Sequence, residues 1–309
     1  MLAVLSGGTG TPKLLQGLVR LLGRRKLSVI VNTGEDVEVS GLKVSPDIDS
    51  VMYTLAGIVN EETWYGIRGD TFMCHEMLKR LGEPELLRLG DRDRAVNIRR
   101  TLGLKQGKPL SEVTRELCER LGVRANVLPM SDDLVQTRVD TEAGTMSFHE
   151  FWVRRRAADA VKSVSYEGAG EAKPAPGVLE AIQTAKLIII GPSNPVTSIG
   201  PILAIEDIRD EIIRNRERVL AVSPIVGGAA VSGPAGQLMK GLGYKVNPLG
   251  VAKMYRGIIG TLVLDWSDRS RARAVEEFGV SAAFADLLMP NIAARVRLAR
   301  EVLGIAKFH

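Results

Sequence analysis

Short apolar runs alternate with helical patterns at the start of the chain. Leu2 to Leu5 is an apolar run that ends at Ser6-Gly7-Gly8, and leucines then recur at helical spacing from Leu14 to Leu22. A second apolar run, Ser28 to Val31, ends at Asn32. The pattern predicts a strand, a glycine turn, a helix and a second strand, which together make a βαβ unit with parallel strands.

The same alternation returns in the second half of the chain. A helical pattern over Val178 to Ala185 precedes the apolar run Leu187 to Ile190, and a helix predicted from about Ile202 to Arg216 leads to a strand over Val219 to Ser223. Fully apolar strands that alternate with helices are typical of a parallel sheet whose two faces are both covered. We therefore predict an α/β fold with a Rossmann-like parallel sheet and helices on both faces.

The middle of the chain departs from this alternation. Apolar residues recur at helical spacing through about 50–135, which predicts a mostly helical insertion. The segment of about 136–177 contains short β-like runs and ends in a loop rich in Gly, Pro and Ala. We expect residues 1–309 to form a single α/β domain that carries this helical and short-strand insertion.

Composition narrows the class of protein. The 309 residues are 45% hydrophobic and 25% charged, which is an ordinary globular composition. No apolar run is long enough to span a bilayer, and the start of the chain lacks the basic region of a signal peptide. Two cysteines cannot supply a disulfide framework or a four-ligand metal site. We therefore expect a cytoplasmic protein with no membrane partner.

The charge balance points to an anionic ligand. Forty-one basic and 36 acidic side chains give a net charge of +5, which suits a nucleic acid or a small ligand rich in phosphate. Aromatic residues make up only 5% of the chain, and no recognition helix or zinc-finger spacing is present, so a nucleic acid is disfavoured. We expect a phosphate-rich small ligand and no nucleic-acid partner.

Four predicted strands end in small or polar residues. In an open parallel sheet, ligands bind beyond the carboxyl ends of the strands, near the point where the strand order reverses. The loops at Gly7, Asn32, Gly191 and Gly227 should therefore face one cleft. This convergence predicts a binding site without naming its ligand.

The loop after the first predicted strand reads Ser6-Gly-Gly-Thr-Gly-Thr-Pro-Lys13. Its glycines let backbone N–H groups approach phosphate oxygens at the positive end of the following helix, and the lysine can add charge. The spacing matches neither the dinucleotide fingerprint nor the Walker loop, and a tight turn without a ligand is the alternative. The candidate phosphate-binding residues are Gly7, Gly8, Thr9, Gly10 and Lys13.

Carboxylates follow the second predicted strand in two places. Asn32-Thr-Gly-Glu-Asp36 lies where many nucleotide-binding folds contact ribose or base, although a polar turn explains it equally well. Ser45-Pro-Asp-Ile-Asp49 places Asp47 and Asp49 two residues apart in a loop, where both can meet one Mg²⁺ or orient an attacking hydroxyl. The alternative is that Asp49 caps a helix beginning at Val51.

A third polar segment, Arg88-Leu-Gly-Asp-Arg-Asp-Arg94, is denser in charge than its neighbours and contains a glycine. Such a loop can present arginines to anionic groups, and a surface cluster of ion pairs explains it almost as well. His75 and His149 show no metal-ligand spacing, so we expect no structural zinc site.

Six segments, taken in order, closely resemble the 2-phospho-L-lactate transferase family (CofD). Each is weak alone, whereas six in order at the family's spacing are specific, and the likeness covers nearly the whole chain. The segments are Ser6-Gly-Gly-Thr-Gly-Thr-Pro-Lys-Leu-Leu15, Asn32-Thr-Gly-Glu-Asp36, Ser45-Pro-Asp-Ile-Asp49, Arg88-Leu-Gly-Asp-Arg-Asp93, Gly191-Pro-Ser-Asn-Pro195 and Ser223-Pro-Ile-Val-Gly-Gly228.

The resemblance implies a Mg²⁺-dependent transferase of coenzyme F-420 biosynthesis. The family moves 2-phospholactate from lactyl-2-diphospho-5′-guanosine to a ribityl hydroxyl of 7,8-didemethyl-8-hydroxy-5-deazariboflavin, called Fo. The products are the F-420-0 precursor and GMP. Some members use the enolpyruvyl analogue of the donor and so transfer enolpyruvyl phosphate, and the sequence does not separate the two donors.

The resemblance also implies roles for particular residues. The family's acceptor (Fo) contacts fall on Asp49 and Arg88. Family members usually have Asp-Asp after Asn-Thr-Gly, whereas this chain has Glu35-Asp36, so a metal or guanosine role is not carried over to position 35. Asp47 and Asp49 are the candidate catalytic and Mg²⁺-binding residues. Further donor contacts are expected from Asn32, Ser193, Asn194, Gly227 and Gly228.

Two other classes of protein share some of these sequence features. A nucleotide-sugar-binding regulator similar to the YvcK-like gluconeogenesis factors would share a related glycine-rich start and bind without turnover. The segments ending at Asp49 and Asp93 favour the transferase. An NAD-dependent dehydrogenase is disfavoured by the incomplete dinucleotide fingerprint. For a soluble enzyme of this size we expect a homodimer.

Overall fold

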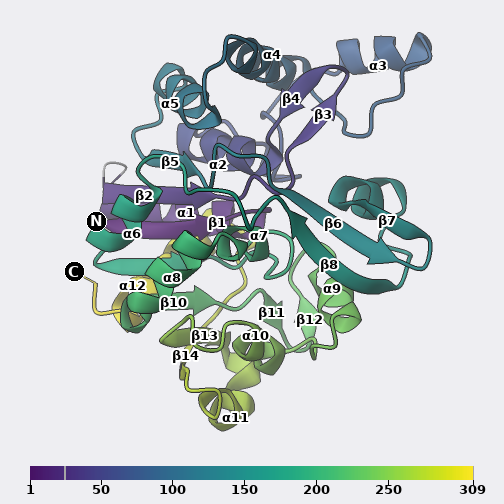
Figure 1. Ribbon diagram of the computed structural model, residues 1–309. Helices are drawn as coiled ribbons and strands as arrows, with labels where there is room; N and C mark the ends of the chain where they lie inside the picture. Colours follow the sequence, from purple (N-terminus) through teal and green to yellow (C-terminus); the bar gives the residue numbers. More distant parts are fainter. Residues whose placement is uncertain (24–25, 309) are drawn as a thin grey trace.

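A computed structural model describes residues 1–23 and 26–308 and has a parallel sheet at its centre (Figure 1). The sheet contains β1 (Leu2–Ser6), β2 (Leu27–Val31), β5 (Asn126–Pro129), β9 (Leu187–Ile190), β10 (Val219–Val222), β13 (Thr261–Asp265) and β14 (Ser281–Ala285). Their order is β14-β13-β10-β9-β1-β2-β5, and every neighbouring pair is parallel. The predicted α/β class with a Rossmann-like sheet is confirmed.

The strand order reverses at β1. From β1 the chain adds β2 and β5 on one side, and it later places β9, β10, β13 and β14 on the other. Leu5 of β1 pairs with Ile30 of β2 and with Ile190 of β9, so the loops after these three strands leave the sheet at one edge. This is the position at which open parallel sheets bind ligands.

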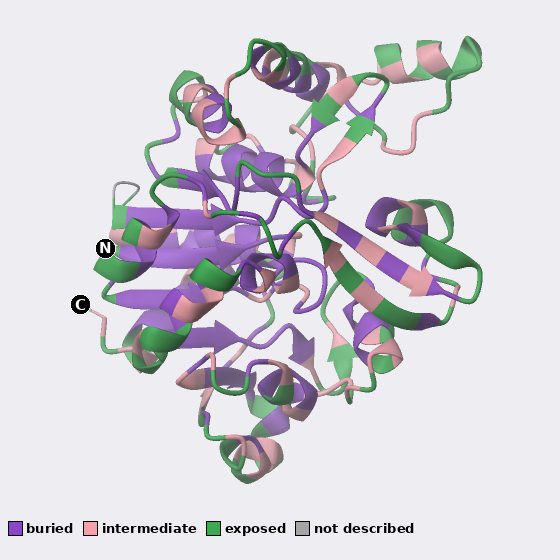
Figure 2. Ribbon diagram, in the orientation of Figure 1, coloured by how far each residue is buried: buried purple, intermediate pink, exposed green. Residues whose placement is uncertain are grey.

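Helices cover both faces of the sheet. One face carries α1 (Gly10–Leu22), α2 (Pro46–Ala56), α5 (Leu110–Arg120) and α12 (Ile292–Ile305), and the other carries α6 (Val178–Thr184), α8 (Glu206–Arg214) and α10 (Pro248–Met254). Because side chains alternate along a strand, Leu2 and Val4 pack under the first group of helices, while Ala3 and Leu5 pack under the second group. Figure 2 shows the buried residues concentrated in the sheet and on the inner sides of these helices.

No helix within the described residues has both the length and the apolar character needed to cross a bilayer. The two cysteines are free, with Cys118 buried and Cys74 exposed.

The four strands predicted for the parallel sheet are present as β1, β2, β9 and β10, but β13 and β14 were not predicted. The helix expected over 202–216 is two helices, α7 (Gly200–Ala204) and α8. They are separate because the backbone at Ile205 is extended, with φ −76° and ψ 113°.

The segment expected as a helical insertion, about 50–135, contains more than helices. It holds most of α2, then α3 (Met73–Arg80), α4 (Asp91–Lys105) and α5. It also contains β5, which pairs with β2 and is an edge strand of the main sheet. Asn-Val-Leu-Pro is too short a run for its pattern to distinguish it from the helical surroundings.

Residues 136–177 contain the expected short strands. Here β6 (Gln136–Thr141), β7 (Gly144–Ser147) and β8 (Val161–Glu167) form an antiparallel sheet in the order β7-β6-β8. Between β7 and β8 the chain makes a π-helical turn, Glu150–Arg154, that the pattern did not predict. The remaining α-helices and hairpin strands of the described chain are β3 (Val37–Val39), β4 (Leu42–Val44), β11 (Ile225–Val226), β12 (Ala229–Ala230), α9 (Ala235–Gly241) and α11 (Ala272–Glu276).

Candidate active site

The glycine loop joins β1 to α1 and packs against the loop after β9. A Cβ atom on Gly10 would lie 1.9 Å from the backbone oxygen of Pro192, so only glycine lets the two loops approach this closely. The hydroxyl of Ser193 lies 2.6 Å from that of Thr11 and donates to the carbonyl of Gly7. Ser193 therefore connects the two loops through hydrogen bonds, one of which is to the carbonyl of Gly7.

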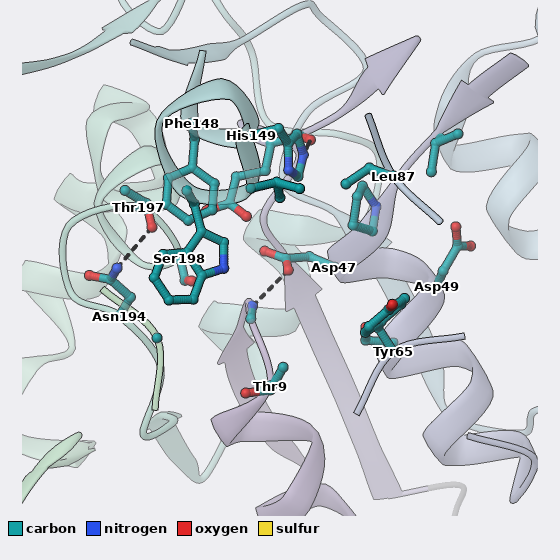
Figure 3. Close-up of a pocket in the computed structure, with 18 of the residues that line it drawn as sticks. Thr9, Asp47, Asp49, Tyr65, Leu87, Phe148, His149, Asn194, Thr197 and Ser198 are labelled. Carbon is teal, nitrogen blue, oxygen red and sulfur yellow. Dashed lines mark hydrogen bonds between the residues drawn. The ribbon is translucent and has the colours of Figure 1, made fainter. Parts of the chain in front are cut away.

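Asp47 holds the glycine loop from α2. It lies in the first turn of this helix, whose N-cap is Ser45, and not in a loop as expected. Its Oδ1 accepts a 2.7 Å hydrogen bond from the N–H of Gly8, and its Oδ2 accepts a 2.9 Å bond from the side chain of Asn32. Figure 3 shows this carboxylate directed toward the glycine loop near Thr9. Asn32 is fully buried and positions Asp47.

Asp49 is the partner of a buried arginine. It too lies in the first turn of α2 and does not cap the helix. Arg100 of α4 has no exposed surface, and both of its terminal nitrogens donate to the Asp49 carboxylate. Arg100 also donates to Asn97, which donates to Asp93, and the Asp93 carboxylate accepts a 2.7 Å bond from the hydroxyl of Tyr53. These contacts tie α2 to α4.

Arg88 belongs to the loop that leads into α4. Glu85 fixes this loop by accepting two hydrogen bonds, of 2.9 and 2.7 Å, from Arg94. Arg88 is exposed, and its guanidinium carbon lies 3.9 Å from the centre of the Phe72 ring. Arg94 is thus committed to Glu85, whereas Arg88 is free of ion pairs with the described side chains and is available to a ligand.

One cavity of about 450 Å³ lies at this edge of the sheet, within the usual range for small-molecule sites. It is bounded by the loops after β1 and β9, the first turn of α2, the Arg88 loop and the π-helical turn. Segments far apart in the sequence therefore share one site (Figure 3). The predicted site residues that line it are Gly8, Thr9, Gly10, Asp47, Asp49, Arg88, Ser193 and Asn194.

The other predicted donor contacts lie outside this cavity. Lys13 lines a second cavity, of about 270 Å³, which adjoins the first at the glycine loop. Its ammonium lies 5.3 Å from the centre of the Trp64 ring, and burial, with a smaller effect from Arg295, lowers the pKa of Lys13. Gly227-Gly228 forms the turn between β11 and β12 at positive φ and lines neither cavity.

Aromatic residues form a wall of the cavity that the sequence patterns did not identify. Phe148, His149 and Trp152 line it from the end of β7 and the π-helical turn, and Tyr65 lines it from the segment after α2. Ser147-Phe-His-Glu-Phe-Trp152 is a local concentration of rings in a chain with 5% aromatic residues, and this is the signal that would have identified it.

Buried carboxylates concentrate beside the cavity. Burial raises the pKa of Asp47 to about 6 and that of Asp36 to about 8, and it raises the pKa of Glu35 well above its ordinary range. Burial lowers the pKa of His149, which favours the neutral ring, and its Nε2 donates a 2.7 Å hydrogen bond to the backbone carbonyl of Glu35.

These carboxylates suit a cation that takes most of its ligands from a bound substrate. In residues 1–23 and 26–308, no group of three or more His, Cys, Asp or Glu side chains is arranged to hold a metal ion. Mg²⁺ commonly binds through one or two carboxylates and completes its shell with phosphate and water. Glu35 and Asp47 line the cavity, and Oε1 of Glu35 lacks a partner among the described atoms. Because Asp49 is already paired with Arg100, Mg²⁺ fits Glu35 and Asp47 better than it fits Asp49.

The chain is similar in sequence to proteins of known family. The chain matches the family model described as 2-phospho-L-lactate transferase CofD over residues 2–283. It is 50% identical to the 2-phospho-L-lactate transferase of Methanopyrus kandleri, with 99% of this chain and 97% of that protein covered. It is 48% identical to the one from Methanocaldococcus jannaschii, with 98% and 97% covered.

The fold is also found among solved structures. The crystal structure of a UPF0052 family protein from Bacillus halodurans superposes with a TM-score of 0.64 at 18% identity, and 98% of each chain is covered. At this identity the likeness supports the fold alone. The family model and the relatives at 48–50% identity cover nearly the whole chain, and the chain therefore belongs to the 2-phospho-L-lactate transferase CofD family.

Proposed function

We propose that this protein transfers 2-phospholactate or enolpyruvyl phosphate from lactyl-2-diphospho-5′-guanosine, or from its enolpyruvyl analogue, to a hydroxyl of Fo and releases GMP. The observation that carries the proposal is the single cavity in which a glycine loop meets two carboxylates and an exposed arginine. The name shared by the relatives, 2-phospho-L-lactate transferase, supports the same reaction.

The start of α1 is the proposed site of the donor diphosphate. Gly10 begins this 13-residue helix and lines the cavity, and the positive end of a helix favours phosphate. Ser193 and Asn194 line the same cavity from the loop after β9. Lys13, in the adjoining second cavity, offers a positive charge to the rest of the donor nucleotide.

The reaction requires alignment of two substrates more than covalent chemistry by the protein. The acceptor hydroxyl oxygen attacks the phosphorus that carries lactate and forms a new P–O bond. The bond from that phosphorus to the bridging oxygen breaks, and GMP leaves with that oxygen. Asp47 lines the cavity beside the glycine loop, and its pKa, raised by burial to about 6, suits it to accept the hydroxyl proton.

Two further groups support this step. Arg100 fixes the Asp49 carboxylate at the cavity wall, where it can accept a hydrogen bond from Fo. Glu35 would hold Mg²⁺, which when bound would supply positive charge to the donor diphosphate.

The proposal is tested by incubating the protein with Mg²⁺, Fo and each guanylylated donor in turn, and by identifying the products by mass. We expect phospholactyl-Fo or its enolpyruvyl analogue, together with GMP, and the donor that reacts faster identifies the natural group. A folded protein that gives no product with either donor would contradict the proposal and would favour a binding regulator.

A further inference from the structure

Trp152 lines the cavity and is partly exposed. Of the three tryptophans, Trp64 lies against Arg295, whose guanidinium carbon is 4.5 Å from the ring centre, and Trp266 stacks on Phe284 with the ring centres 5.2 Å apart. Trp152 lines the cavity with 39% of its surface exposed, and within the described chain no ring or cation stacks on it. A large apolar face is therefore available to a ligand.

The π-helical turn holds Trp152 in place. Phe151, its neighbour in the turn, is fully buried, and the Phe151 carbonyl accepts a 2.8 Å hydrogen bond from the N–H of Ala157. Phe148, just before the turn, is buried and also lines the cavity. π-Helical turns are rare and are frequent at functional sites. The indole is thus presented by an anchored backbone, which lowers the entropy cost of stacking a ligand on it.

Apolar and aromatic side chains line the cavity together with Trp152. Leu87 and Val153 line the cavity without any hydrogen-bonding group, and Tyr65, which is 46% exposed, adds a second accessible ring. Figure 3 shows Phe148 and Tyr65 on opposite sides of Asp47. A planar ring with large apolar faces can stack on such aromatic side chains.

We propose that Trp152 is the stacking platform for the planar ring of the acceptor and that it determines acceptor specificity. The inference rests on the proposed function, because it takes the acceptor to be a deazaflavin. In this arrangement the ring lies against Trp152, and its ribityl chain extends toward Asp47 and the glycine loop. The π-helical turn thus recognises the ring, while the sheet edge recognises phosphate.

Fo fluorescence provides a binding assay that does not depend on turnover. Fo is titrated with the native protein, with Trp152→Leu, which removes the flat ring, and with Trp152→Phe, which keeps a smaller one. Trp266→Leu is the matched control, because Trp266 is 56% exposed and lies outside the cavity. GDP binding is measured in parallel by calorimetry, and circular dichroism checks that each variant is folded.

We expect Trp152→Leu to raise the Kd for Fo by about tenfold or more and Trp152→Phe to raise it less than about threefold, since a stacked ring contributes about 1–3 kcal/mol. The Kd for GDP should be unchanged in both Trp152 variants, and Trp266→Leu should bind Fo as the native protein does. Unaltered Fo affinity in both Trp152 variants would overturn the inference, as would a loss confined to GDP, which would place the donor on this ring. If the native protein itself does not bind Fo, the proposed function fails instead.

Discussion

Arg100 is a fully buried cation, and the charge of Asp49 depends on it. Replacing Arg100 by methionine leaves the Asp49 carboxylate buried without its counter-ion. Breaking a buried ion pair from one side typically costs about 3–5 kcal/mol, so we expect Arg100→Met to lower the free energy of unfolding by about that amount. Urea denaturation followed by circular dichroism measures the loss.

A double variant shows whether the two residues act as a pair. In Asp49→Asn with Arg100→Met, the uncompensated charge is gone, so the combined loss should be smaller than the sum of the single losses. Additive losses would show that Asp49 does not depend on Arg100. Arg115→Met is the control, because its pairing with Glu119 is exposed and should contribute less than about 1 kcal/mol.

Gly10 tests the contact between the two loops at the donor side. A methyl group at this position meets the backbone oxygen of Pro192, which cannot rotate away as a side chain would. We expect Gly10→Ala to weaken GDP binding by about tenfold or more, because the displaced loop carries the proposed phosphate contacts. Calorimetry measures the affinity. Gly304→Ala, where the added methyl meets no atom within 4 Å, should bind GDP as the native protein does.

If Gly10→Ala also bound GDP normally, the glycine loop would not be the phosphate site.

The sequence predicted the glycine loop because it ends an apolar run, and it predicted both aspartates because two carboxylates lie two residues apart. It could not identify Arg100. In Asp-Arg-Asp-Arg-Ala-Val-Asn-Ile-Arg-Arg100 the arginines look alike, and only tertiary packing determines which of them is buried.

Among the helices, α3 is joined to α4 by hydrogen bonds at its start. None of its residues is buried, as Figure 2 shows. Asp91, at the start of α4, accepts hydrogen bonds from the Thr71 hydroxyl and from the N–H groups of Met73 and Cys74 at the start of α3. Asp70 in turn accepts bonds from N–H groups at the start of α4. Each segment thus caps the other.

Removing one cap should release α3. We expect Asp91→Ala to speed amide hydrogen exchange in residues 73–80 several-fold while the sheet strands exchange at native rates. Asp91→Asn keeps an acceptor oxygen and should have a smaller effect. Native exchange rates in Asp91→Ala would show that α3 is held by other contacts.

The same cap has a defined pH dependence. The hydrogen bond from Thr71, with those from the helix amides, holds the pKa of Asp91 below its ordinary value of 3.8. A lowered pKa in the folded state means that the cap is fully effective above that value and is lost as the pH falls through the lowered pKa. After correction for intrinsic exchange rates, amide exchange in residues 73–80 should therefore not change with pH near neutrality. It should rise only in acid, where Asp91 becomes protonated.

The elements themselves were predicted unevenly. β1, β2, β9 and β10 are buried on both faces and have continuous apolar runs, so their sequences identify them. β5 is short and β14 begins with exposed or half-buried residues, so their runs do not stand out. The π-helical turn could not be predicted, because its extra residue per turn leaves no repeating pattern in five residues.

For the molecule as a whole, the parallel sheet assembles the site. Loops at the carboxyl ends of parallel strands meet at one edge, so the sequence alone predicted that the loops after β1 and β9 would share a cleft. The turn at Gly227 does not line this cleft, because it lies at the end of the β11–β12 hairpin. The N–H of Gly227 donates instead to the Asp268 carboxylate. The rings of 147–152 stand out in the sequence, but their place in the cavity depends on the packing of the β6–β8 sheet, which no local pattern encodes.

Transfer of a group between two bound substrates is tested by the amount of GMP released from a limiting quantity of donor, with and without Fo, in the presence of Mg²⁺. We predict one GMP for each phosphorylated Fo formed and almost no GMP when Fo is omitted. GMP release that is independent of Fo, or no release while the nucleotide remains bound, would contradict the account.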